Sequence, residues 1–444
     1  MAQPLMDFKA WRTLWKTRSY FRLWLAQAVS GLGNRVHGIA LLVYVYALTG
    51  KGLDLGVLML VMGAASLIAS PIAGVLADRY NPRRIMIIAD TARFALVLLL
   101  PFTTALWQIY TLAFLLAIGQ SAYMPSVFSL IPKLVGRSNL ITANSLSATT
   151  QNVLTIVGPA LGGFLVAQIG PVASAWLVAQ GVPTWLPIEH FGVTIAFFFD
   201  SATFLFSVLM LTSIGRLPNH GETPAEAPAD GVAELDDSRY QAKGFFREMW
   251  QGIRMQIEDP VLRFLLIVFI ALIFFTSCLN PLFIVLSDKV LGVGTEGFGM
   301  LLSTLGLGGI VGGLIYGSIG NRFGKLQTVV NLLFLDALMI VVMGITPWFW
   351  AALAVFFVFG MIGTAFHVSV ITLLQERIPD KLRGRAMGTI SVAFEPVSMA
   401  SMGLGGAISD MVGVQVLFVG SGIAEFCVAV VARLTKSFRK FQKL

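Results

Sequence analysis

A glutamate inside a long apolar run is the residue of this sequence best suited to proton chemistry. Glu395 immediately precedes Pro396, and on a helix it would share one face with Ser391, Ser398 and Met402. Ionised groups are costly in hydrocarbon, and a proline frees backbone groups that attract water. A partly desolvated carboxyl group there can take up and release a proton. Glu395 is therefore the first candidate for proton coupling. A carboxyl bonded to the serines that never titrates is the alternative.

Two further ionisable residues in apolar runs extend this list. Asp200 is flanked by three phenylalanines and a serine, and it is the second proton-coupling candidate. Histidine titrates near neutral pH, so His37 could follow a proton gradient, with a hydrogen-bonded packing role as the alternative. Asp90 and Arg93 lie three residues apart and are placed to satisfy each other on one helix.

Other polar residues are candidates for lining a substrate cavity. One stripe of the run 20–48 at helical spacing contains Gln27, Ser30, Asn34, His37 and Tyr44. Arg35 points away from this stripe and either binds an anionic substrate or holds an acid on a neighbouring helix. The remaining cavity candidates are Gln120, Tyr123, Asn280 and His367.

The composition shows what kind of element must position these residues. Of the 444 residues, 56% are hydrophobic and 12% charged, and the mean hydropathy is +0.80. One soluble core cannot bury so much apolar surface, so the sequence predicts a membrane protein and excludes a soluble enzyme. Zinc-protease and serine-hydrolase motifs are also missing. The two cysteines, Cys278 and Cys427, lie within apolar stretches and indicate packing rather than a disulfide or a metal site.

The apolar runs predict an all-α protein with twelve membrane-spanning helices in two groups of six. A span needs about 20 apolar residues, and candidates lie at 20–48, 54–78, 85–104, 106–131, 140–169, 191–212, 261–287, 295–320, 326–346, 349–375, 386–412 and 414–432. The predicted organisation is an N-terminal segment 1–19, a six-helix bundle 20–212, a linker 213–260, a second bundle 261–432 and a basic tail 433–444.

The linker has two parts of different composition. Its first part is rich in proline and acidic residues and cannot bury a core. In its second part Phe246, Met249, Trp250, Ile253 and Ile257 recur at helical spacing. This pattern predicts either a helix at the membrane surface or a short solvated helix.

The distribution of basic residues predicts the orientation. The net charge of +8 comes from lysines and arginines that lie between the apolar runs and do not form one face, so nucleic acid is not an expected partner. Almost all of them fall on one side, whereas the other side has only Lys51 and Lys289. The positive-inside rule then places both termini and the linker in the cytoplasm of a protein in the cell membrane, in contact with membrane lipids.

An internal repeat connects the two halves. Matching residues recur at an offset of 243, among them Gly56 and Gly299, Arg79 and Arg322, Trp107 and Trp350, and Ser126 and Ser369. Duplicated halves place a binding site between them, where rocking exposes it to each side in turn. The repeat therefore favours a transporter. No phosphate-binding Gly-Lys motif is present, so the proton gradient is the expected energy source and no cofactor is expected.

Two glycine-containing motifs suggest how such a protein would open and close. The first follows 54–78 and contains Gly74, Asp78, Arg79, Arg83 and Arg84, with Gly317 and Arg322 in a weaker second copy. A carboxylate such as Asp78 can accept hydrogen bonds from a helix N-terminus in the other half and act as a gate; a basic loop that merely obeys the positive-inside rule is the alternative.

The second motif contains Gly158, Pro159, Gly162 and Gly163. Its proline and glycines permit a kink, and the glycine pair would let a helix of the second half approach. The alternative is a kink that serves helix packing and says nothing about the direction of transport.

With these motifs, and with Pro379, Arg383, Gly384, Arg385 and Gly388, nearly the whole chain resembles the major facilitator superfamily, in particular drug-efflux transporters such as macrolide and siderophore exporters. Asn81 and Pro82 depart from the usual motif. The motif of Gly158, Pro159, Gly162 and Gly163 resembles the one that is associated with antiporters in this superfamily. The resemblance implies a proton-coupled antiporter that exports hydrophobic or amphipathic small molecules, and a monomer is expected.

Alternatives within the same fold are a siderophore exporter, an importer or facilitator, and a lysolipid transporter. In this superfamily the third, sixth, ninth and twelfth helices lie outside the central cavity. The resemblance therefore favours a helix-locking role for Asp200, Asp336 and Glu425.

Overall fold

The structure, a computed structural model, describes residues 17–135, 139–180, 191–215, 260–319, 324–377 and 380–435. These residues are almost entirely helical and contain no strand. The predicted surface helix and most of the linker lie outside the described residues, as do residues 1–16 and 436–444.

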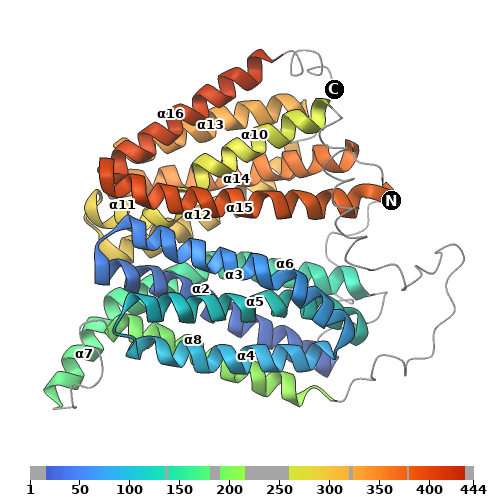
Figure 1. The fold of residues 1–444 in the computed structure, drawn as a ribbon, viewed down its shortest axis with the longest axis vertical. Helices are drawn as coiled ribbons and strands as arrows, with labels where there is room; N and C mark the ends of the chain where they lie inside the picture. The colour runs from blue at the N-terminus through green and yellow to red at the C-terminus, as the bar shows by residue number, and fades with distance from the viewer. Residues whose placement is uncertain are drawn as a thin grey trace, which may run out of the picture. The chain divides into compact units, whose positions relative to one another are not determined.

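The described residues of the first half form long helices, apart from the ten-residue α7 (Figure 1). The helices are α2 (Arg18–Thr49), α3 (Gly52–Arg79), α4 (Pro82–Leu99), α5 (Leu106–Val135), α6 (Leu140–Phe164), α7 (Gly170–Ala179) and α8 (Phe191–Ser213). A wider helical turn, Leu165–Ile169, joins α6 to α7. Turn residues set the boundaries: Gly50 ends α2 with a left-handed backbone, and Asn81 and Pro82 begin α4.

The second half repeats this plan. Its helices are α10 (Pro260–Ser277), α11 (Phe283–Lys289), α12 (Gly294–Ile319), α13 (Lys325–Ile345), α14 (Phe349–Arg377), α15 (Asp380–Val412) and α16 (Val414–Leu434). A tight turn, Asn280–Leu282, separates α10 from α11, so the predicted span 261–287 is a broken helix. Pro281 lacks a backbone donor and accounts for the break.

The predicted all-α membrane fold is confirmed. Within the part of the chain that the structure describes, eleven helical segments are long and apolar enough to cross a membrane, and most of their bounds lie within a few residues of the predicted runs. The one predicted span outside these eleven is 386–412, which corresponds to α15; this helix has the required length.

The repeat is visible in where the helices begin. α4 begins at Pro82 and α13 at Lys325, and α5 begins at Leu106 and α14 at Phe349, in both cases 243 residues later. Ser126 and Ser369, a predicted pair, are both buried and donate to the carbonyl four residues earlier, those of Ala122 and Ala365. α7 and the residues after it interrupt the repeat before α8.

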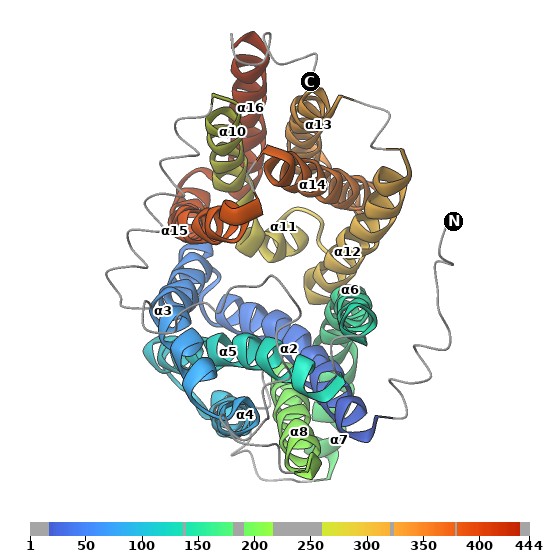
Figure 2. The same cartoon turned by 90° about the vertical axis from the view of Figure 1, so that its right-hand side faces the viewer.

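The chain packs as two compact units, and residues Ser287–Ser303 pack with the first half rather than the second. Within the first unit α2 packs mainly against α8 and α6, α3 against α5, and α4 against α8 and α5 (Figure 2). Within the second unit α13 packs against α16 and α14. The interior of each unit therefore combines helices that are distant in sequence, such as α2 with α8 and α13 with α16, and sequence neighbours such as α4 with α5.

Candidate functional site

A buried network of polar side chains lies between α2, α4 and α8 in the first unit. At one end, His37 Nδ1 lies 3.4 Å from Asp200 Oδ2, and the two side chains are 10% and 1% exposed. The Thr203 hydroxyl donates to the Asp200 carboxylate at 3.3 Å and to its backbone carbonyl at 2.7 Å. Two of the three predicted proton-coupling residues thus form one pair.

Gly33 makes this pair possible. A Cβ atom at position 33 would stand 2.1 Å from Thr203 Oγ1 and 2.4 Å from Asp200 Oδ1. Any other residue would displace α8 or turn the carboxylate away from His37. The His37 ring also packs against Phe197, with ring centroids 5.5 Å apart.

An arginine forms the other end of the network and interacts electrostatically with both Asp200 and His37. Arg93 Nη1 lies 3.3 Å from Asp90 Oδ1, so the predicted pairing of these residues is present. Arg93 Nη2 also donates to Asn34 on α2, and the Ser207 hydroxyl of α8 donates to Asp90 Oδ2 at 2.6 Å. The guanidinium lies over the Phe204 ring, 4.1 Å from its centroid.

Unless it binds a proton, this network has one more negative charge than it has positive charges. It contains two carboxyl groups, one guanidinium that is always charged and one imidazole. With His37 neutral and both acids ionised, the network has a net charge of −1. One proton on the His37–Asp200 pair makes it neutral, which a low-dielectric interior favours.

The predicted cavity residues lie in different places. Asn34 belongs to the network, and the centroid of the buried Tyr123 ring lies 6.0 Å from Arg93 Cζ. Gln27 and Gln120 are half-buried on α2 and α5, whereas Arg35 is exposed. Asn280 is exposed at the break after α10, His367 is exposed on α14, and Glu395 is exposed on α15.

The first gating motif ends α3 and begins α4. The Asn81 side chain accepts from the Arg83 backbone at 3.1 Å, so the unusual Asn-Pro sequence caps α4. The Arg83 side chain donates to the carbonyls of Leu211 at 2.7 Å and Thr212 at 2.6 Å. This arginine therefore caps the C-terminal end of α8, which favours a cation.

Other residues of that motif are less informative. Arg84 is exposed, and a Cβ atom on Gly74 or Gly317 would meet nothing within 4 Å. The side chains of Asp78 and Arg79 and the whole of Arg322 lie outside the described residues. The proposed latch at Asp78 stays a prediction.

The glycines of α6 approach two different helices. A Cβ atom on Gly158 would come within 2.2 Å of Arg35 Cβ, and one on Gly162 within 3.1 Å of Ile39 Cβ, both on α2. Of these glycines, only Gly163 faces a helix of the second half of the sequence. A Cβ atom on Gly163 would stand 3.1 Å from the Cα of Gly299 in α12. The expectation that Gly162 also serves such a contact is wrong, because consecutive residues point about 100° apart around a helix. Pro159 lies inside α6.

Polar contacts join the ends of helices beside this glycine pair. Tyr46 Oη donates to Asp288 Oδ2 at 3.0 Å, Lys289 Nζ donates to the Gly50 carbonyl at 3.3 Å, and Gln168 donates to Glu296. All these residues belong to the first unit. They hold the start of α12 and the end of α11 against α2 and the turn after α6.

The sequence did not identify Ser207 or the contact between Arg93 and Asn34 as parts of a site. A buried Asp90 and Arg93 pair was predictable from the spacing on α4. Its partners on α2 and α8 were not, because only tertiary packing brings these helices together.

Comparison with known proteins gives consistent results. A family model described as Major Facilitator Superfamily matches residues 23–401 and 265–441. Macrolide efflux protein A of Streptococcus pyogenes is 24% identical over 441 residues, covering 96% of this chain and 98% of that protein. The enterobactin exporter EntS of Escherichia coli is 24% identical over 385 residues, covering 85% and 82%.

Two further comparisons agree with these. The multidrug efflux pump Tap of Mycolicibacterium fortuitum is 25% identical over 426 residues, covering 92% of this chain and 93% of the pump. Among solved structures, an inward-facing bacterial homologue of the human lysosomal transporter Spinster has the same fold, with a TM-score of 0.75 and 16% identity over 96% of this chain and 98% of that one.

Proposed function

The chain belongs to the major facilitator superfamily, and from this premise we propose that it is a proton-coupled antiporter that exports hydrophobic or amphipathic small molecules by alternating access. It is a multi-pass membrane transporter and not an enzyme. The cell membrane, cytoplasmic termini, a monomeric state and surrounding lipids complete the proposal. No cofactor is required, because protons drive the cycle.

The buried His37–Asp200 pair carries the proposal of proton coupling. Its proton decides whether the network with Asp90 and Arg93 is neutral or has a charge of −1. Neutralising a buried charge favours burial of the network, and losing the proton favours its hydration. A proton that enters from one side and leaves to the other can therefore drive a change between two conformations.

Glu395 is the second candidate for the proton site. It is exposed on α15 and lies beside Pro396, where α15 lacks one backbone hydrogen bond. Asp200 is fully buried, so its protonation has the larger effect on the energy of the protein. We therefore assign the coupled proton to the His37–Asp200 pair and treat Glu395 as the residue to test beside it.

The direction and substrate class are supported by the relatives. A macrolide efflux protein, a multidrug efflux pump and an enterobactin exporter all align along most of this chain. Each proton that moves inward supplies about 2.3 kcal/mol per 100 mV of membrane potential, and about 1.4 kcal/mol more per pH unit. That energy is enough to concentrate a substrate outside the cell at least tenfold.

A transport assay tests export directly. We expect cells that express the protein to accumulate less of at least one compound from a panel of macrolides, hydrophobic cations and catecholate siderophores, and a protonophore to remove the difference. Efflux of the catecholate alone would identify a siderophore exporter, which the similarity to the enterobactin exporter favours as the second candidate. Greater accumulation would identify an importer. Movement of labelled lysolipid in proteoliposomes, without any of these effects, would identify a lipid transporter.

A further inference from the structure

Two acidic side chains face each other in the interior of the second unit. Asp336 of α13 and Glu425 of α16 are 3% and 0% exposed, and their carboxyl groups interact with each other. Among the described residues, Asp336 Oδ2 and both carboxyl oxygens of Glu425 have no hydrogen-bond donor. Two ionised carboxylates in this position would repel each other without compensation.

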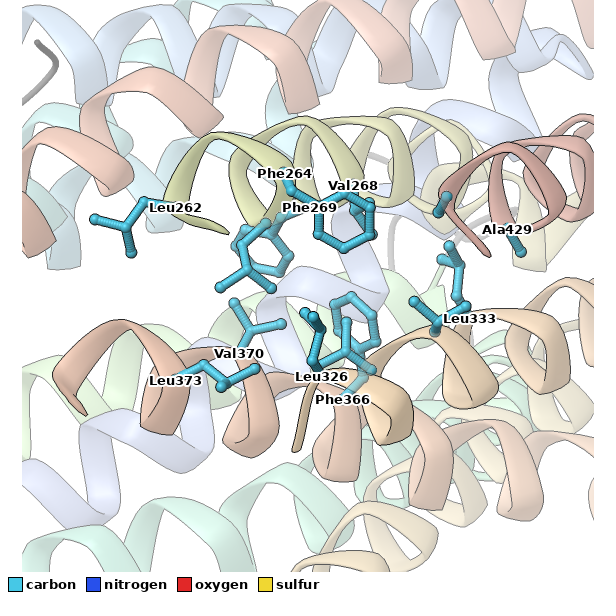
Figure 3. Close-up of a cluster of buried hydrophobic side chains, with 14 of the residues drawn as sticks. Leu262, Phe264, Val268, Phe269, Leu326, Leu333, Phe366, Val370, Leu373 and Ala429 are labelled. Atoms are coloured by element: carbon cyan, nitrogen blue, oxygen red, sulfur yellow. The ribbon is translucent and has the colours of Figure 1, made fainter. Parts of the chain in front are cut away.

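Close helix packing explains why water does not reach the pair. A Cβ atom on Gly422 would stand 2.7 Å from Val341 Cγ2 and 2.8 Å from the Ala337 carbonyl, so α13 and α16 are in backbone contact one turn from Glu425. On the other side, Leu333 and Ala429 lie in a cluster of buried hydrophobic side chains (Figure 3). The pair is therefore enclosed along both helices.

The internal repeat shows what is missing from this place. Asp336 stands 243 residues after Arg93, the cation that pairs with the buried Asp90 of the first unit. The second unit thus has an acid where the first has a guanidinium. The helices packed against the pair also contain charged or titratable side chains among the described residues. Arg263 lies in the first turn of α10, and His367 of α14 and Glu395 of α15 are exposed. Cys278, after α10, is a further titratable group that interacts electrostatically with Glu425.

We propose that Asp336 and Glu425 share a proton and form a second proton-binding site, which locks α13 to α16 while the proton is bound. A carboxylic acid donates to a carboxylate, so one proton provides the missing hydrogen bond and removes one of the two charges. When the proton is released, both carboxylates are charged and still buried, and their repulsion separates α13 from α16. This site lies in the other unit from the His37–Asp200 pair, and its existence does not depend on the proposed direction or substrate of transport.

Infrared spectroscopy of the purified full-length protein tests for the proton itself. At neutral pH we expect a carboxylic-acid carbonyl band that shifts in deuterated water and is lost in the Asp336→Asn/Glu425→Gln double variant. The exposed Asp410→Asn on α15 is the matched control and should keep the band. Identical bands in the wild type and the double variant, from acidic to neutral pH, would overturn the proposal.

Thermal stability against pH provides an independent measurement. Exposed carboxyl groups ionise near pH 4, so a folded protein that still holds the shared proton binds more protons than the unfolded chain, and its stability falls as the pH rises. We expect the melting temperature of the wild type to fall more steeply than that of Glu425→Gln between about pH 5 and about pH 9. Parallel curves would contradict the proposal, as would a wild type stabilised at high pH by Na⁺ but not by choline, which indicates a bound cation instead.

Discussion

Two buried ionisable side chains of the first unit, Asp200 and Arg93, each have a glycine beside them that makes room for the side chain. Gly33 faces Asp200, and a Cβ atom on Gly119 would come within 3.0 Å of Arg93 Cγ. Without these glycines the charged groups could not reach their partners across the helix interfaces. Glycine therefore supports the site at the scale of single residues, as well as the close packing of membrane helices.

Gly33→Ala tests this dependence. We expect the substitution to destabilise the protein by about 1–3 kcal/mol, because the new methyl group overlaps Thr203 and Asp200. Gly38→Ala is the matched control on α2, since a Cβ atom there meets nothing within 4 Å. Melting curves in detergent measure both variants. Equal melting temperatures would show that α8 moves aside without cost.

Arg93→Met tests the charge balance of the network. We expect a loss of about 3–5 kcal/mol, because the substitution leaves Asp90 buried without its cation. Adding Asp90→Asn should restore much of that loss, since it removes the unpaired charge while Ser207 keeps a partner. If the double variant is no more stable than Arg93→Met alone, the ion pair does not hold these helices.

The spacing of residues predicted some of this site but not all of it. Asp200 and His37 were both expected to handle protons, because they are ionisable residues in apolar runs. Their contact depends on α2 packing against α8, far away in sequence, and no local pattern encodes that pairing. Glu395 had the strongest local signal, its neighbouring proline, yet it is exposed on α15. A proline reports local backbone geometry and does not determine burial.

At the scale of helices, the fold follows from apolar length and from the residues that end each run. Most predicted spans agree with the observed helices to within a few residues, because glycine, proline and asparagine mark the turns between them. The break between α10 and α11 was missed although Asn280 and Pro281 mark it, because the apolar residues on both sides add up to the length of one span. Hydropathy cannot distinguish a straight helix from a broken one of the same composition.

A contact between glycines of α6 and α12 leads to a prediction at this scale. A Cβ atom on Gly299 would stand 2.7 Å from the Pro159 carbonyl, so the two helices meet through their backbones. We expect Gly299→Val to reduce the transport rate about tenfold or more, because overpacking by about 1.4 kcal/mol or more disfavours the conformation that has this contact. Gly363→Val on α14 is the control, with nothing within 4 Å. Equal transport rates, at equal amounts of protein in the membrane, would show that the contact is not part of the cycle.

At the scale of the whole molecule, the two halves share a plan but differ in buried charge. The first unit compensates its acids with Arg93 and His37, whereas the second has Asp336 and Glu425 at the interface of α13 and α16. A duplicated scaffold can thus hold protons in two chemically different environments. The repeat was visible in the sequence. The difference in charge has a meaning only when the helices that enclose each group are known.

Substrate-driven proton movement is the most direct test of the proposed function. In inverted membrane vesicles with an imposed pH gradient, we expect a transported compound to release protons from wild-type vesicles and not from vesicles with Asp200→Asn. The exposed Asp410→Asn should behave as the wild type, and Glu395→Gln should keep at least part of the proton movement. Proton release that is unchanged in Asp200→Asn but lost in Glu395→Gln would transfer the coupling to α15. Substrate transport without any proton movement in the wild type would contradict the proposed antiport.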